Sequence, residues 1–432
     1  MPENSTDRII TIDALRGFAL FGILYAHMIF WYAGGALPEQ LYKENYGIPS
    51  GITLGFYFIF VLAKFFSIFS FLFGLSFYIQ LKSLMKRNDN FILRFSWRLL
   101  ILGIIGFIHH TLWRADILSI YVPLGFLLIF ARNLSNRTLL VIGFMLILNL
   151  PTKIYEIISL FINGQLPFSN APIAEEGAHY YEIMKNAPFL EVALDNIKAL
   201  PTKLNYQISS GRLLITFGFF LLGMFAGRMQ WFENLNETKP VFQKIWKKTG
   251  LILLVAIAIG ILLGALSFSL GLNLEKNPWA MWVAGLFADI FNSGLTLFYI
   301  TGFTLLMYRK KWIRFLSPLA NVGKMALTSY LMQTLFGLLI FFSFGLGLFT
   351  KTTPAINTLI SFGIFGLQII FSHWWLKRFH YGPIEWLWRS ATFLKPQKML
   401  KSDTPLAIAA NQVWHLEQPE SKGLEKPGNR FD

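Results

Sequence analysis

The stretch DALRGFALFGILYAHM (residues 13–28) has the apolar composition of a membrane-spanning helix, yet it contains Asp13, Arg16 and His27. Ionisable side chains are expensive in hydrocarbon and seldom face lipid. Arg16 and His27 are eleven residues apart, which places both on one helix face, about 16 Å apart along the axis. Asp13, one turn before Arg16, can pair with it. This face predicts a protein-lined pocket or path within a membrane protein.

Two interpretations stay open for each of these residues. Arg16 is either a boundary arginine that snorkels to lipid phosphate or an anion-binding residue, since a guanidinium suits the phosphate of a nucleotide-like cofactor. His27 is either a histidine hydrogen-bonded between helices or a neutral general base. Their common face favours the functional interpretation for the pair.

The composition agrees with a membrane location. Of 432 residues, 54% are hydrophobic and 14% are charged, whereas soluble domains carry about 25% charged residues. A span needs about 20 mostly apolar residues. The predicted fold is therefore an all-α polytopic integral membrane protein with about ten transmembrane helices, the fourth being the shortest. The predicted spans are 12–33, 53–80, 95–113, 116–131, 138–155, 207–228, 248–273, 280–308, 318–348 and 355–377.

Basic residues gather in alternate loops of this arrangement. Apart from the long segment 156–206, the other loops hold only Lys43, Arg114, Lys276 and Lys351. By the positive-inside rule, both termini lie in the cytoplasm. The rule also accounts for the net charge of +15, so the expected partner is the lipid bilayer and not nucleic acid. The chain has no cysteine, which excludes disulfides, thiol nucleophiles and Cys-ligated metals.

A second polar group occupies the stretch GFIHHTLWRADILSIY (106–121), which the topology makes a tight external turn. It contains His109, His110 and Asp116. A carboxylate beside imidazoles is the usual arrangement for orienting a base. The alternative is a polar turn in which Asp116 caps the next helix. The three residues are also a possible metal site, but they lack a specific ligand spacing, so no residue is assigned as a metal ligand.

Other polar residues fall within or between the predicted spans. Arg212 begins the sixth span, and Asp289 with Asn292 forms a helical-face pair in the eighth. They could line the same pocket, or Arg212 and Asp289 could pair with each other. The external segment 156–206 contains HYYEIMKNAPFLEVALDNIKAL, whose spacing suits either a surface helix over the external mouth or a solvated loop.

Four blocks resemble the bacterial YeiB-like membrane proteins, whose C-terminal half is a domain of unknown function (418). Ala115 and Ser329 stand where the family pattern has Gly and Asn. The blocks are RIITIDALRGFALFGILYAHM (8–28), ADILSIY (115–121), VGKMALTSYLMQTL (322–335) and GPIEWLWR (382–389).

The first half of that family is distantly similar to a superfamily of membrane acyltransferases that includes the acyltransferase-3 enzymes and heparan-glucosaminide acetyltransferase. The acyltransferase-3 pattern, an arginine, ten residues and a histidine, is matched by Arg16 and His27. The resemblance implies that Arg16 helps to hold acyl-CoA as co-substrate, with no tightly bound cofactor. It implies that His27 is the base, and His110 with Asp116 are further catalytic candidates.

The implied reaction moves an acyl group, expected to be acetyl, from cytoplasmic acyl-CoA to a hydroxyl or amine of a cell-surface sugar or lipid.

The 322–335 block is polar for a span and either faces the same cavity or makes interhelical hydrogen bonds. Glu385 is expected to be structural, paired with Arg389. The candidate substrate-binding residues are His109, Arg212, Asp289, Asn292, Tyr330 and Gln333.

The predicted organisation is an acyltransferase-like transmembrane half (1–230), a C-terminal transmembrane half (231–398) and a disordered cytoplasmic tail (399–432). The predicted location is the bacterial inner membrane, crossed many times. Two other functions remain open. A transporter or flippase would use the polar face for passage without covalent chemistry, and a non-catalytic membrane partner would need neither Arg16 nor His27. No oligomeric state is assigned.

Overall fold

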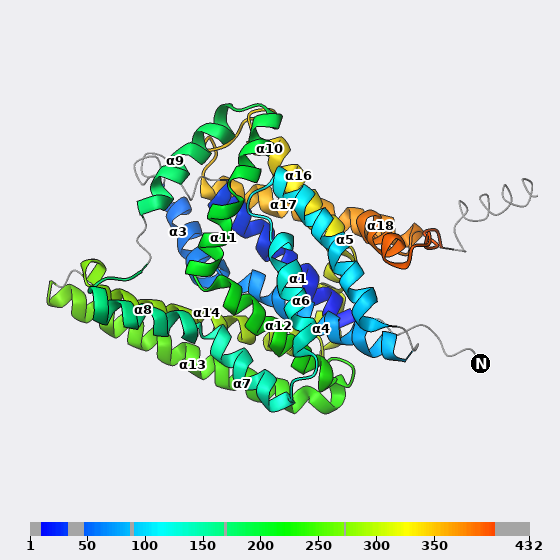
Figure 1. The fold of residues 1–432 in the computed structure, drawn as a ribbon, viewed down its shortest axis with the longest axis horizontal. Helices are drawn as coiled ribbons and strands as arrows, with labels where there is room; N and C mark the ends of the chain where they lie inside the picture. The colour runs from blue at the N-terminus through cyan, green and yellow to red at the C-terminus, as the bar shows by residue number, and fades with distance from the viewer. Residues whose placement is uncertain (1–9, 33–46, 87–89, 168–170, 272–273, 402–432) are drawn as a thin grey trace, which may run out of the picture.

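A computed structural model describes residues 10–32, 47–86, 90–167, 171–271 and 274–401, and the regular elements of these residues are helices (Figure 1). The all-α prediction is confirmed. Most of the predicted tail, residues 402–432, lies outside the described residues. In chain order the helices are α1 (Ile10–Ala26) with the π-helix η1 (His27–Trp31), α3 (Ile48–Phe56) with the π-helix η2 (Tyr57–Val61), α4 (Lys64–Met85), α5 (Phe91–Leu112), α6 (Leu118–Ala131), α7 (Asn136–Ile147), α8 (Leu150–Asn163), α9 (Ala171–Asn186), α10 (Phe189–Lys198), α11 (Leu200–Ser209), α12 (Arg212–Arg228), α13 (Leu235–Ser269), the 3₁₀ turn η3 (Leu274–Lys276), α14 (Pro278–Leu306), α15 (Lys310–Lys324), α16 (Ala326–Phe341), α17 (Pro354–Arg378) and α18 (Pro383–Phe393).

The protein is a multi-pass membrane protein. By length and composition, the described part of the chain has six helical segments able to cross a bilayer, or up to nine if each of three bent helix pairs is one span. The fourth predicted span corresponds to the shorter apolar helix α6. Helix α13 exposes much of its apolar surface, as suits a helix that faces lipid, and Leu254 is 67% exposed.

Several helices end inside predicted spans. The predicted span 53–80 is divided where Ala63 adopts a left-handed conformation (φ 68°), so that α4 starts at Lys64 and continues to Met85. The residues around this break are apolar except for Lys64, and a single lysine in an apolar run does not predict a break. The bent pairs are α7–α8 (47°), α11–α12 (68°) and α15–α16 (82°).

The predicted external segment contains several short helices. Helix α8 continues to Asn163, and α9, α10 and α11 follow. The stretch considered for one surface helix is broken between α9 and α10, where Pro188 has an extended backbone (ψ 162°). A proline lacks the N–H that would continue the helical hydrogen bonding. Figure 1 shows α9 and α10 along the upper edge of the molecule, above α11.

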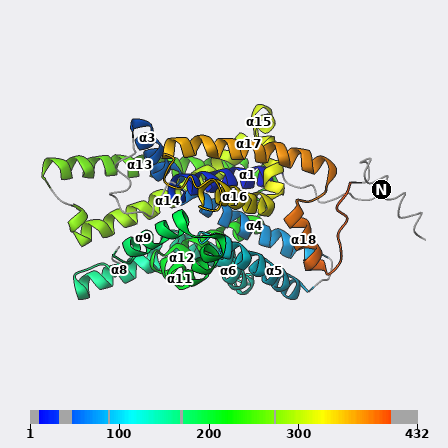
Figure 2. The same ribbon diagram turned by 90° about the horizontal axis from the view of Figure 1, so that it is seen from above.

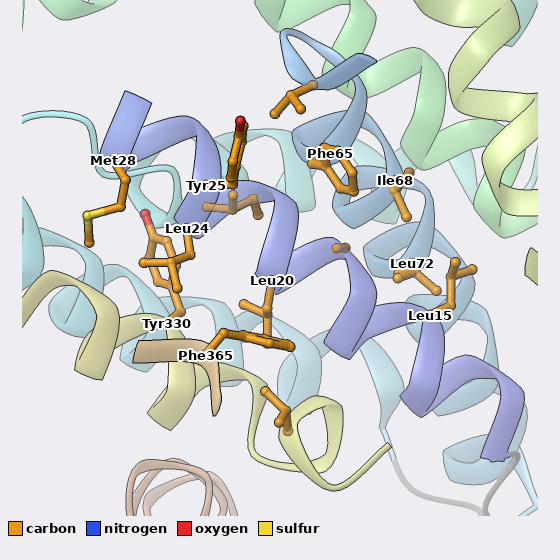
Figure 3. Packing of buried hydrophobic residues seen from close by; sticks show 14 of the residues in the cluster. Leu15, Leu20, Leu24, Tyr25, Met28, Phe65, Ile68, Leu72, Tyr330 and Phe365 are labelled. Atoms are coloured by element: carbon orange, nitrogen blue, oxygen red, sulfur yellow. The ribbon is translucent and has the colours of Figure 1, made fainter. Parts of the chain in front are cut away.

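Helix α1 lies in the centre of the bundle. Figure 2 separates α13 and α17 on one side from α6 and α12 on the other, with α1, α4 and α16 between them. Figure 3 shows the α1 side chains Leu15 and Leu20 packing between Leu72 of α4 and the residues Tyr330 and Phe365 of α16 and α17. The first span is thus surrounded by protein.

Two glycines allow α1 and α15 to touch through their backbones. A Cβ at Gly17 would lie 2.1 Å from the carbonyl oxygen of Leu319, and one at Gly323 would lie 1.8 Å from that of Asp13. Small residues at such crossings permit the close packing that holds membrane helices together. This contact brings the end of α15, and with it the start of α16, against the charged start of α1.

The Glu385 carboxylate connects the sequence block 382–389 to the block 322–335. Glu385 Oε1 accepts hydrogen bonds from the N–H groups of Leu327 (2.6 Å) and Thr328 (3.0 Å) at the start of α16. The Thr328 hydroxyl donates to Glu385 Oε2 (2.5 Å) and accepts from the Ile384 N–H (3.1 Å). A carboxylate is favourable at a helix N-terminus, where free N–H groups gather. Glu385 therefore fixes the position of α16.

The predicted pairing of Glu385 with Arg389 is wrong. The Glu385 carboxylate faces α16, while the Arg389 guanidinium lies over the rings of Tyr381 (5.0 Å) and Phe393 (5.3 Å). The free N–H groups of α16 are the stronger attraction for a buried carboxylate, because they lie in line with the helix dipole.

Replacing Gly323 with alanine should destabilise the protein. The added methyl group would overlap the Asp13 carbonyl, and overpacking of this kind costs about 1–3 kcal/mol. Gly260→Ala is the matched control, because a Cβ at Gly260 meets nothing within 4 Å and alanine is the better helix former. We expect a lower melting temperature in detergent for Gly323→Ala and no loss for Gly260→Ala. Equal melting temperatures would contradict the backbone contact.

Candidate functional site

A cavity of about 240 Å³ lies between α1, α4, α5, α6, α15, α16 and α18. Most of its lining is apolar, and charged or amide side chains gather at one end. The apolar lining includes Phe69, Leu72, Phe73, Phe77, Phe95, Leu99, Leu102 and Leu118. The polar lining includes Arg16, Ser76, Gln80, Arg98, Lys324 and Glu385.

The cavity opens at its charged end. The Arg16 side chain is 22% exposed there, whereas Tyr121 and Tyr330, at the other end of the lining, are 1% and 3% exposed. The charged end is the one at which α1 and α5 begin. It is also the end that the loop charges assign to the cytoplasm.

Two guanidinium groups border the opening in different ways. Arg16 donates to Asp13 Oδ1 (2.7 Å), as predicted, and to the Ser76 hydroxyl (2.6 Å). The Arg98 guanidinium lies 3.7 Å over the Trp388 ring and makes no hydrogen bond or ion pair with the residues described. The Arg98 charge, which the sequence reading missed, is therefore open to an anionic ligand.

A buried chain of three polar groups lies beyond the closed end. His109 Nδ1 is 2.7 Å from Asp116 Oδ1, and His109 Nε2 is 2.8 Å from the hydroxyl of Thr334. The ring of Tyr330, which lines the cavity, packs 4.9 Å from the His109 ring. One tyrosine therefore belongs both to the cavity wall and to the surroundings of the imidazole.

Asp116 performs both of the roles considered for it. Besides contacting His109, its carboxylate accepts from the N–H groups of Leu118 (3.0 Å) and Ser119 (2.8 Å) at the start of α6. The ammonium of Lys203 lies 3.7 Å from Oδ2. Burial opposes ionisation, but the His109 hydrogen bond and the Lys203 charge outweigh it and lower the pKa of Asp116 to about 2.

Helices α10 and α11 cover the α5–α6 turn. Lys203 of α11 lies 3.2 Å from His110 Nδ1 and donates to the Ser119 hydroxyl (2.8 Å). Arg114 pairs with Asp195 of α10. His110 Nε2 is buried and has no hydrogen-bond partner within the described ranges. The role of Lys203 had no sequence signal, because a single lysine in a polar segment is ordinary.

His27 does not line the cavity. Arg16 and Ile23 of α1 do, and His27, the first residue of η1, lies one turn beyond Ile23. Its ring is 5.7 Å from that of Trp113, and it makes no hydrogen bond with a described residue. The helical geometry predicted the common face, but not that Tyr121 and Tyr330 close the cavity before it reaches His27.

The remaining predicted residues lie outside this cluster or serve packing. Arg212 is stacked on the Phe66 ring (4.1 Å) and does not pair with Asp289. Asp289 accepts instead from Asn149 (3.3 Å) and lies 3.7 Å from Lys153 Nζ.

Asn292, on the same helix as Asp289, has a half-buried side chain with no hydrogen bond to a described residue. Gln333 is buried and donates to the Leu20 carbonyl (3.3 Å) and to Gln368 Oε1 (3.1 Å). Gln333 therefore makes the interhelical hydrogen bonds considered for its block, and neither residue lines the cavity.

Comparison with known proteins gives similarity over most of the chain. Residues 226–395 match a family described as "Protein of unknown function (DUF418)". The chain is 28% identical to "Uncharacterized protein YxaH" of Bacillus subtilis (strain 168), over 93% of this chain and 98% of that protein. It is 29% identical to "Uncharacterized 39.9 kDa protein in amylase 3'region" of Bacillus acidopullulyticus, over 90% of this chain and 94% of that one.

It is also 26% identical to "Uncharacterized protein YeiB" of Escherichia coli (strain K12), over 89% of this chain and 96% of that protein. The matched domain contains Tyr330, Thr334 and Glu385, whereas His109 and Asp116 precede it. The similarity to complete relatives covers both parts of the site. The chain is therefore similar over most of its length to YeiB and YxaH, and its residues 226–395 match this domain of unknown function.

Proposed function

We propose that the protein is a membrane acyltransferase that takes an acyl group from cytoplasmic acyl-CoA and transfers it to a hydroxyl or amine acceptor. The proposal rests on one arrangement of residues. An apolar cavity with a cationic opening ends at Tyr330, whose ring packs against His109 and thus next to the His109–Asp116 hydrogen bond.

The cavity suits an anionic acyl donor. Coenzyme A carries phosphate groups, and guanidinium groups bind phosphate with matching geometry. Arg98 and Arg16 border the opening, while phenylalanine and leucine side chains line the interior, where an acyl chain would lie. The basic loops at the same end would raise the local concentration of an anion.

His109 is the residue best arranged to act as the base. With Nδ1–H donated to Asp116, its other nitrogen is unprotonated and can accept a proton. This tautomer is inferred from the hydrogen-bond partners. His27 lacks an orienting partner among the residues described, whereas Asp116 orients His109 and the cavity-lining Tyr330 packs against it, so we assign the base role to His109.

Arg98→Gln should weaken donor binding. A hydrogen bond to a charged group contributes about 1.5 kcal/mol, so its loss should raise KM for acyl-CoA about tenfold. The control is Arg94→Gln, one turn earlier on α5, where the guanidinium lies over Phe393 and does not line the cavity. The assay is CoA release from labelled acyl-CoA by inverted membrane vesicles. An equal KM for the two variants would contradict donor binding at this opening.

His109→Gln should lower kcat at least about 100-fold, the usual contribution of a general base. His27→Gln should change kcat by less than about tenfold, because no described carboxylate orients the His27 ring as Asp116 orients that of His109. His373→Gln, on the partly exposed side of α17, is the control for the loss of any histidine. If His27→Gln abolishes turnover and His109→Gln does not, the assignment of the base to His109 is wrong.

A transporter or flippase is the second candidate, and a different observation favours it. Asn149, at the α7–α8 break, donates to Asp289 and to the Ser210 carbonyl (3.4 Å) at the α11–α12 break. Lys153 bridges Glu156 (2.9 Å) and Asp289. Interrupted helices with buried charges are typical of transport sites. Lipid translocation in proteoliposomes that survives His109→Gln, without thioester use, would favour this function over acyl transfer.

A further inference from the structure

Thr334 completes an ordered set of three buried groups with His109 and Asp116. The carboxylate contacts one ring nitrogen, and the hydroxyl contacts the other, at 2.7 and 2.8 Å. All three residues are at most 2% exposed. Carboxylate, imidazole and hydroxyl in this order are the arrangement that activates a hydroxyl nucleophile on unrelated folds.

The hydroxyl of Thr334 is used differently from those of other buried helical threonines. Thr296, Thr301 and Thr304 each donate to the backbone carbonyl four residues earlier, which is the ordinary way to satisfy a hydroxyl within a membrane helix. Thr334 has the His109 ring as its only hydrogen-bond partner among the described residues. Its hydroxyl is therefore directed at a base instead of its own helix.

Thr334 lies between the cavity and the helices α10 and α11. Tyr330, one turn earlier on α16, lines the cavity that opens at the charged end. On the other side, Lys203 of α11 covers Asp116 and His110. A group carried on Thr334 would therefore be within reach of a donor that displaces the Tyr330 ring, and of an acceptor that arrives beneath α10 and α11.

We propose that Thr334 is the nucleophile that carries the acyl group, as an ester, between donor and acceptor. The inference rests on the acyltransferase function proposed above. Thr334 Oγ attacks the thioester carbonyl carbon, the new C–O bond forms and the C–S bond breaks. The hydroxyl proton passes to His109 Nε2 and then to the sulfur, which leaves as the CoA thiol. Asp116 stabilises the transient imidazolium.

The second half of the reaction reverses these roles. An acceptor hydroxyl or amine gives its proton to His109 Nε2 and attacks the threonine ester, and Thr334 Oγ leaves and takes that proton. The sum is acyl-CoA plus acceptor giving acylated acceptor plus CoA, and no other reactant is needed. The donor and the acceptor need never be bound together, so each can approach from its own side of the membrane.

The experiment is exchange of labelled CoA into unlabelled acetyl-CoA, and into a longer acyl-CoA, by the purified full-length protein without acceptor. A covalent acyl intermediate permits this exchange. We expect exchange for the native protein and for Thr334→Ser, and at least a 100-fold loss for Thr334→Val. Thr296→Val, which removes a buried hydroxyl bonded to its own helix, is the matched control and should exchange normally. Intact mass should show one acyl group per chain, located on the peptide that contains Thr334.

The outcomes separate this inference from the function on which it rests. Acyl-CoA turnover in vesicles that depends on Arg98, with no exchange and no acyl adduct, overturns the role of Thr334 and leaves the acyltransferase intact. Exchange that survives in Thr334→Val also overturns it. Neither turnover nor exchange with either acyl-CoA overturns both proposals. Thr334→Ser keeps the hydroxyl, so its retained exchange shows that a loss in Thr334→Val comes from removal of the hydroxyl and not of the methyl group.

Discussion

The buried carboxylate of Asp116 is the group on which the rest of this site depends. A carboxylate without partners in a low-dielectric interior costs several kcal/mol. Here the N–H groups of Leu118 and Ser119, the His109 ring and the nearby Lys203 ammonium compensate it. These partners belong to α5, α6 and α11. Satisfying one charge thus fixes the α5–α6 turn, the orientation of an imidazole and the helix that covers both.

The C-terminal part of the chain positions Thr334, the third residue of the site. Thr334 reaches His109 because α16 is fixed at its start by Glu385 and held near α1 by the Gly17 and Gly323 backbone contacts. The site is therefore assembled from both sides of the predicted boundary at residue 230. The sequence blocks at 322–335 and 382–389 have a common physical role, since the second caps the helix that the first forms.

The sequence predicted features that depend on local spacing and composition. The helical fold, the Asp13–Arg16 pair and the proximity of Asp116 to His109 follow from apolar runs, one-turn spacing and a short turn. The common face of Arg16 and His27 follows from the same periodicity. Where the cavity ends along that face depends on Tyr121 and Tyr330, which come from two distant helices, and a single sequence gives no such distance.

Most of the features that the sequence did not predict also depend on contacts between residues far apart in the chain. Arg98 and Trp388 are separated by 290 residues in the chain, and their stacking is a tertiary contact. Lys203 lies in a polar segment, where a lysine is unremarkable until α11 places it against Asp116. Thr334 resembles any threonine of a membrane helix, because only the direction of its hydroxyl distinguishes it. The left-handed break at Ala63 occurs in a run that is apolar except for Lys64, and nothing local marks it as a break.

The central claim is that a cavity open to the cytoplasm leads to the buried His109–Asp116 pair. The chain has no cysteine, so a single thiol introduced as Gln80→Cys would report on the cavity alone. A membrane-impermeant maleimide should label it in inverted vesicles and not in right-side-out vesicles, and bound acyl-CoA should slow the reaction. Lys351→Cys, in a loop assigned to the outside, should label in the opposite orientation. Labelling of Gln80→Cys only from the outside, or an unchanged rate with acyl-CoA present, would contradict the account.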